Sequence, residues 1–83
     1  PPGILRELYR LSDAEARLSW RLANGETLEE IATAEGSSRE TVRSQLKRIF
    51  AKTGTSRQAE LVRLILIGPA LWAQVPARLQ PPV

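Results

Sequence analysis

The sequence predicts a small all-α domain with proline-rich flanks. Apolar residues return at spacings of three and four, whereas the apolar–polar alternation of a half-buried strand is absent. Ser/Thr-x-x-Glu patterns and glycines divide this periodic part into separate helices. The 83 residues suffice for one hydrophobic core. We expect four helices, at about residues 13–23, 28–35, 38–53 and 57–67.

The first two expected helices begin with the same capping pattern. Ser12 precedes Glu15 by three residues, so that hydroxyl and carboxylate can each bind a backbone N–H at a helix start. Thr27 and Glu30 repeat this spacing. Gly25 ends the first helix favourably, because glycine adopts the left-handed conformation at little steric cost.

The third and fourth helices are also bounded by small residues. Ser37 or Ser38 caps the start of the third helix, and Gly54 stops it. The fourth helix follows Ser56 and ends at Gly68, which precedes a proline.

The flanks differ in kind from this central part, because all six prolines lie in them. We expect residues 1–10 to be the end of an interdomain linker, with one helical turn at Ile4 to Tyr9, and residues 69–83 to be a tail. The domain proper then covers residues 11–68. Since the chain lacks an initiating Met, we expect it to be part of a longer protein.

Composition excludes several classes of function. The chain has no Cys and no His, which excludes disulfides, thiolate chemistry, imidazole catalysis and nearly all zinc sites. Carboxylates do not cluster at helical spacing, so we expect neither an enzyme nor a bound metal or cofactor. No apolar run approaches the roughly 18 residues of a spanning helix, and we expect a cytoplasmic domain without membrane contact. The net charge of +3 does not by itself indicate a binding partner, because what matters is whether the basic residues cluster on one surface.

The junction of the second and third helices predicts a helix-turn-helix. Gly36 and Ser37 leave room only for a sharp corner between a short helix and a longer one. Ile31 faces the core, Ala32 is small where the two helices would cross, and Val42 reaches back to the same core. The alternative is a plain pair of helices in a bundle.

At about 100° per residue, the third helix has two contrasting sides. Its core side consists of Val42, Leu46, Ile49 and Thr53, with Phe50 at the edge. Its outward side consists of Glu40, Arg43, Ser44 and Lys47, flanked by Thr41, Gln45, Arg48 and Lys52. The second helix of a helix-turn-helix enters the major groove of DNA, where Arg and Lys donate to guanine and neighbouring groups bind phosphates. The alternative is a solvent-exposed face whose charges only confer solubility.

Three segments carry a family resemblance. "LSDAE" (11–15), "ANGETLEEIA" (23–32) and "SRETVRSQLKRIFAKTGTSRQAELV" (38–62) resemble, in order and without gaps, the LuxR-type helix-turn-helix domain of bacterial transcription regulators. The resemblance implies a four-helix domain that binds operator DNA as a homodimer. Such domains usually follow an N-terminal part that senses a small molecule or receives a phosphoryl group.

The resemblance also implies roles for individual residues. Bases would be read by Arg43, Ser44 and Lys47. Phosphates would be held by Thr27, Ser38, Thr41, Gln45 and Lys52. The chain departs from the family at Gln45, where His is frequent, at Glu29, where a basic residue is frequent, and at Thr53, where an apolar residue is usual.

Glu15 matches an acidic residue typical of the family. It could set the DNA-binding surface through a contact. The capping pattern favours a structural role instead, with the carboxylate paired to a basic residue of the recognition region.

Apolar residues cover more of the circumference of the fourth helix than the single stripe that usually faces a core. Leu61, Leu64 and Ile65 can fill the core. Val62, Leu66 and Ile67 then lie near the surface, where the family implies a dimer interface. Alternatively, Leu71 and Trp72 of the tail cover the same patch.

A helical module that docks to a protein such as RNA polymerase is the main alternative to DNA binding. Affinity that falls steeply with salt indicates DNA, as does lost sequence preference in an Arg43→Ala variant.

Overall fold

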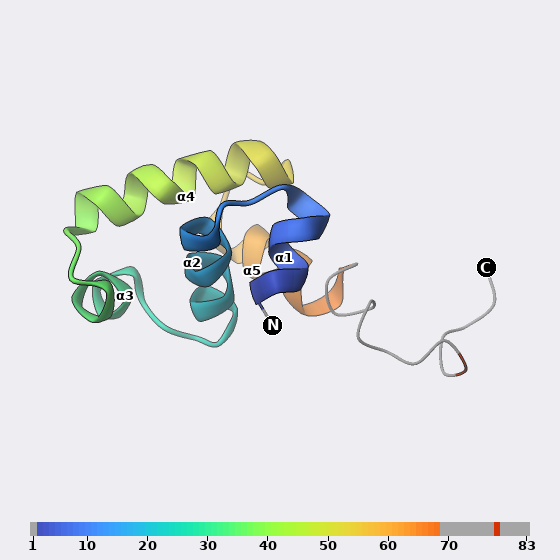
Figure 1. The fold of residues 1–83 in the computed structure, drawn as a ribbon, viewed down its shortest axis with the longest axis horizontal. Coiled ribbons are helices and arrows are strands. Elements are labelled where there is room, and N and C mark those ends of the chain that lie inside the picture. Colours follow the sequence, from blue (N-terminus) through green and yellow to red (C-terminus); the bar gives the residue numbers. More distant parts are fainter. Residues whose placement is uncertain (1, 69–77, 79–83) are drawn as a thin grey trace.

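The computed structural model describes residues 2–68 and residue 78. Over this part of the chain it is all-α and contains no strand, which confirms the expected fold class. Five helices follow one another along the chain (Figure 1). They are α1 (Pro2–Tyr9), α2 (Asp13–Ala23), α3 (Leu28–Glu35), α4 (Arg39–Thr53) and α5 (Gln58–Ile67).

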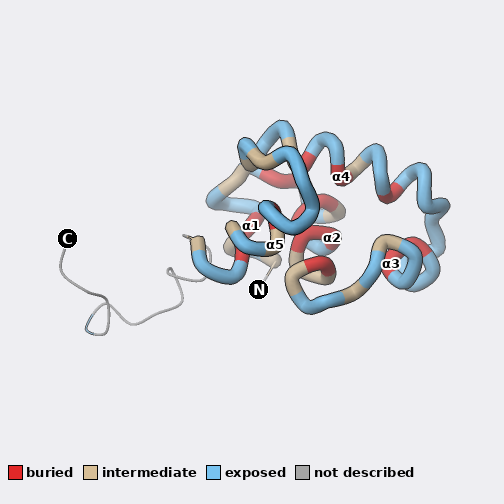
Figure 2. The backbone as a smooth tube through the Cα atoms, turned by 180° about the vertical axis from the view of Figure 1, so that it is seen from behind, coloured by how far each residue is buried: buried red, intermediate tan, exposed pale blue. Residues whose placement is uncertain are grey.

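α2 is the centre of the domain and packs against each of the other four helices. α4 lies along one long side of the molecule, with α3 at its N-terminal end and α1 toward its C-terminal end (Figure 1). Each helix contributes a side chain that is at most 2% exposed: Leu5, Leu18, Ile31, Ile49 and Leu61. Buried residues lie on the inner side of α4, whereas the residues on its outer side are exposed (Figure 2). The core therefore lies on one side of α4 only.

α1 is longer than the one helical turn expected at Ile4 to Tyr9, and it packs into the core although this segment was expected to be the end of a linker. Residues 2–9 form a two-turn helix, and Leu5 is fully buried in the core. Pro2 does not prevent this, because a proline in the first turn lacks only an N–H that would have no helical partner anyway. Ile4 and Tyr9 pack beside Leu5 against the same core.

The capping predictions are confirmed. Ser12 accepts a hydrogen bond from the Glu15 N–H at 3.1 Å, while the Glu15 carboxylate accepts one from the Ser12 N–H at 2.8 Å. Thr27 and Glu30 form the same box at the start of α3. Each box satisfies backbone donors that a helix start leaves unpaired.

The remaining boundaries agree with the expected ones within one residue. Ser38, not Ser37, caps α4, and Gly54 ends it with φ 71°. α5 begins after Arg57, which makes no side-chain cap. Ser56 donates from its hydroxyl and its N–H to the Glu60 carboxylate.

Candidate nucleic-acid interface

The corner between α3 and α4 is built from small residues. Gly36 adopts φ 66°, and the next N–H, that of Ser37, donates to the Ala32 carbonyl at 2.9 Å. Ala32 is 4% exposed, since it lies in the core beside Ile31. Gly36 therefore turns the chain within two residues and sets the direction in which α4 departs.

α4 is held by one side and exposes the other. Val42 and Ile49 are at most 1% exposed, and Leu46 is also buried. Arg43 and Lys47 are exposed on the opposite side, and neither makes an ion pair with any described residue. Ser44, the third expected base-reading residue, is exposed as well. The helix thus presents the unpaired cations of Arg43 and Lys47 and the hydroxyl of Ser44 outward, as the wheel predicted.

Hydroxyl groups gather at the N-terminal ends of α3 and α4. The Ser38 and Thr41 hydroxyls lie 2.9 Å apart, and Ser38 also accepts from the Thr41 N–H. The Thr27 hydroxyl accepts from the Glu30 N–H. A hydroxyl that accepts can still donate its own proton. Helix N-termini also favour anions, so these groups suit contact with phosphate.

Gln45 is more buried than the other expected DNA contacts. It is half-buried and lines a hollow of about 190 Å³ between α2, α3 and α4, together with Arg17 and Glu35. Arg17 and Glu35 form an ion pair at 3.5 Å. The amide of Gln45 therefore lies at the margin of the outward side of α4.

Two other cations of α4 are bound to Glu15 in α2. Lys52 Nζ donates to Glu15 Oε1 at 2.6 Å, and Arg48 Nε lies 3.6 Å from Glu15 Oε2. The Glu15 side chain is only 4% exposed, whereas Arg48 and Lys52 are 60% and 40% exposed. This pairing confirms the structural role expected for Glu15. It also separates Arg48 and Lys52 from the unpaired Arg43 and Lys47.

The Glu15 carboxylate remains charged despite its burial. Burial raises its pKa, but the hydrogen bonds from Lys52 and from Ser12, with the charge of Lys52, outweigh that effect and hold the pKa below its ordinary value. The ion pair and the capping box therefore persist together at neutral pH.

Thr53, where the resemblance implies an apolar residue, is accommodated locally. Its hydroxyl donates to the Ile49 carbonyl at 2.8 Å, one turn earlier in α4. This back-bond satisfies the hydroxyl at the edge of the core. Glu29, the acidic departure in α3, is exposed.

α5 exposes apolar side chains at its C-terminal end. Leu61 and Ile65 are buried as expected, whereas Leu64 is only half-buried. Leu66 is 47% and Ile67 68% exposed. With the half-buried Val62 they line an open groove of about 610 Å³, completed by Gln58, Ala59 and Arg63. Leu71 and Trp72, the alternative cover for this patch, lie outside the described residues.

The chain matches no protein-family model, no curated protein and no solved structure. Across residues 2–68, no helix has the length and apolarity needed to cross a bilayer. The same residues hold no group of three metal-ligating side chains.

Proposed function

We propose that this domain binds double-stranded DNA sequence-specifically, as the output domain of a cytoplasmic bacterial transcription regulator of the LuxR type. One observation carries the proposal: α4 is buried along Val42 and Ile49 and exposes Arg43, Ser44 and Lys47 on the opposite side. A helix held in this way can enter a major groove without losing its core contacts.

Arg43, Ser44 and Lys47 each suit a group of duplex DNA. Arg43 and Lys47 can donate to guanine O6 and N7, and Ser44 can bind either a base edge or a phosphate. The hydroxyls of Thr27, Ser38 and Thr41 flank this surface and suit phosphate oxygens. Phosphate contacts would fix the position of α4, and base contacts would select the sequence.

The apolar end of α5 supports assembly as a homodimer. Leu66 and Ile67 are large, adjacent and exposed, and a two-fold partner would cover them with the same surface. A dimer of this kind would bind an inverted repeat. The same patch also favours the second candidate, docking to a protein such as RNA polymerase, because apolar groups do not bind phosphates.

Selection of bound duplexes from a random oligonucleotide pool tests the proposal. We expect an inverted repeat whose half-sites lie about one helical turn, roughly 34 Å, apart. The observed binding constant should fall with salt, with a logarithmic slope of about 0.9 per phosphate neutralised. No enrichment over several rounds, or binding indifferent to salt, would refute DNA binding and leave protein docking.

Two variants then assign the recognition helix. Arg43→Ala should lose preference for one base pair of the selected site, at a cost of about 1–3 kcal/mol. Arg17→Ala removes the same charge from a residue paired with Glu35 and should leave the preference unchanged. Equal sequence preference in wild type and Arg43→Ala would exclude Arg43 as a base-reading residue.

A further inference from the structure

Four helix ends in the described part of the chain are closed in the same way, but only three of them use glycine. The residues with positive φ are Arg10, Gly25, Gly36 and Gly54. In each case the next N–H donates to the carbonyl five residues before it. These bonds run from Leu11 to Arg6, Glu26 to Arg21, Ser37 to Ala32 and Thr55 to Phe50, at 2.9–3.2 Å. Arg10, with φ 55°, thus occupies a position where glycine fits with less strain.

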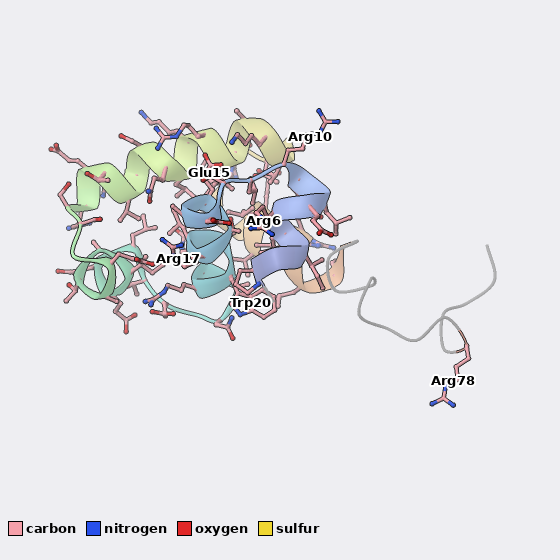
Figure 3. The ribbon with its side chains drawn as sticks, viewed as in Figure 1. Arg6, Arg10, Glu15, Arg17, Trp20 and Arg78 are labelled. Atoms are coloured by element: carbon pink, nitrogen blue, oxygen red, sulfur yellow. The ribbon has the colours of Figure 1, made fainter. Side chains whose placement is uncertain are left out.

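The turn that holds Arg10 lies directly beside the last turns of α4. The Ser12 N–H and Lys52 Nζ both donate to the same atom, Glu15 Oε1. Ser12 follows Arg10 by two residues, so the α1–α2 turn and the C-terminal end of α4 share one anchoring point. In Figure 3 the Arg10 side chain extends from this turn toward the edge of the molecule that α4 occupies.

The Arg10 guanidinium is available, unlike those of neighbouring arginines. Arg10 is exposed and makes no ion pair with any described residue. Arg6 in α1 is paired with Asp13 at 2.6 Å, and Arg17 with Glu35. Packing and helix capping therefore do not account for an arginine at this strained position.

We propose that Arg10 binds a phosphate of the DNA backbone and extends the DNA-contacting surface from α4 onto the α1–α2 turn. The inference rests on the proposed function. A guanidinium presents planar, paired donors that match a phosphate group. Arg10 adds an unpaired cation on the turn next to the C-terminal end of α4, where Glu15 partly offsets the charges of Lys52 and Arg48. Phosphate contacts carry no sequence information, so Arg10 should affect affinity without affecting preference.

Salt titrations of duplex binding test this contact, using the site selected for the wild-type chain. Arg10→Gln and Arg10→Gly should each lower the logarithmic salt slope by about one, with the base preference unchanged. Arg10→Gly should also melt no lower than wild type, because glycine relieves the left-handed backbone. A loss of binding in that variant cannot come from misfolding. Arg10→Lys keeps the charge and should keep the slope.

The matched control is Arg17→Gln, which removes one charge from the ion-paired arginine of α2. Its salt slope should equal that of wild type. An unchanged slope in Arg10→Gln and Arg10→Gly would overturn the Arg10 contact and leave DNA binding by α4 intact. An equal fall in Arg17→Gln would also overturn it, because net charge alone would then explain the effect. Failure of the wild type to bind duplex DNA would remove both proposals.

Discussion

Lys52 Nζ lies 2.6 Å from Glu15 Oε1, so one buried carboxylate joins the end of α4 to the start of α2. The same oxygen accepts the Ser12 N–H, and the second carboxylate oxygen lies near Arg48. Thirty-seven residues of sequence separate Lys52 from Glu15. The contact therefore fixes the axis of α4 against the helix at the centre of the domain.

Replacing this carboxylate should destabilise the domain. Glu15→Gln keeps the size of the side chain but loses its charge, and we expect the free energy of unfolding to fall by about 1–3 kcal/mol. The loss arises because hydrogen bonds to a charged acceptor are stronger than those to an amide. Urea denaturation followed by circular dichroism measures the change.

Glu30→Gln is the matched control. Glu30 occupies the equivalent position in the capping box with Thr27, but it is exposed and has no ion pair with a described residue. Its replacement should cost clearly less than that of Glu15. Equal losses in the two variants would show that capping alone, and not the pair with Lys52, gives Glu15 its importance.

The Glu15 pair should also shape the response to acid. Burial raises the pKa of Glu15, but the bonds from Lys52 and Ser12 hold it below its ordinary value. A carboxylate with a lowered pKa stabilises the fold fully above its unfolded-state pKa, about 4.3, and loses this contribution as the pH falls through the folded-state pKa. The stability difference between wild type and Glu15→Gln should be constant near neutral pH and shrink below about pH 4. A difference that grows in acid would contradict the assignment.

The α3–α4 corner should depend on the conformation of Gly36 and not on space around it. A Cβ at Gly36 would meet no atom within 4 Å, yet φ is +66°. Gly36→Ala should therefore lower the free energy of unfolding by about 1–2 kcal/mol through backbone strain alone. Gly3→Ala is the control, since Gly3 lies in α1 with equally open surroundings. It should raise stability by about 0.5 kcal/mol, because alanine favours a helix.

Much of the fold was predictable because its signals are local. The capping boxes at Ser12 and Thr27 depend on residues three apart, and both are present in the structure. α1 was predicted only as one helical turn, at Ile4 to Tyr9, because the prolines before Gly3 suggested a linker, although Pro2 fits a first helical turn. What makes α1 part of the domain is the burial of Leu5 against α2, a tertiary contact that no local pattern reports.

The candidate site likewise has features that follow from local sequence and features that depend on tertiary contacts. The outward position of Arg43 and Lys47 follows from the period of one helix, so the sequence sufficed. That Glu15 binds Lys52 and Arg48 depends on how α2 crosses α4, and the sequence indicated only that a basic partner was plausible. Arg10 lies in the segment that was expected to be a linker, so no sequence pattern gave a reason to consider it. Its positive φ in the structure drew attention to it.

A buried hydroxyl provides a test of packing in α2. Ser19 is 0% exposed, and its Oγ has no hydrogen-bond partner among the described residues. Ser19→Ala removes an unsatisfied polar atom and favours the helix, so it should raise the free energy of unfolding by up to about 1 kcal/mol. Ser12→Ala, which removes the capping hydroxyl of the same helix, should lower it by about 1 kcal/mol. Thermal melts of both variants measure these changes. Melting temperatures that shift in the same direction in the two variants would contradict the prediction.

The apolar end of α5 should control assembly without controlling the fold. Leu66 is 47% exposed and lines the groove beside Val62, so Leu66→Glu places a charge where a two-fold partner would pack. Sedimentation equilibrium should show a weaker dimer, and affinity for an inverted repeat should fall more than affinity for a single half-site. Leu8→Glu is the control, because Leu8 is similarly exposed, at 44%, but lies on α1. A wild-type chain that stays monomeric at high concentration, on and off DNA, would rule out the α5 interface, as would equal effects of the two substitutions.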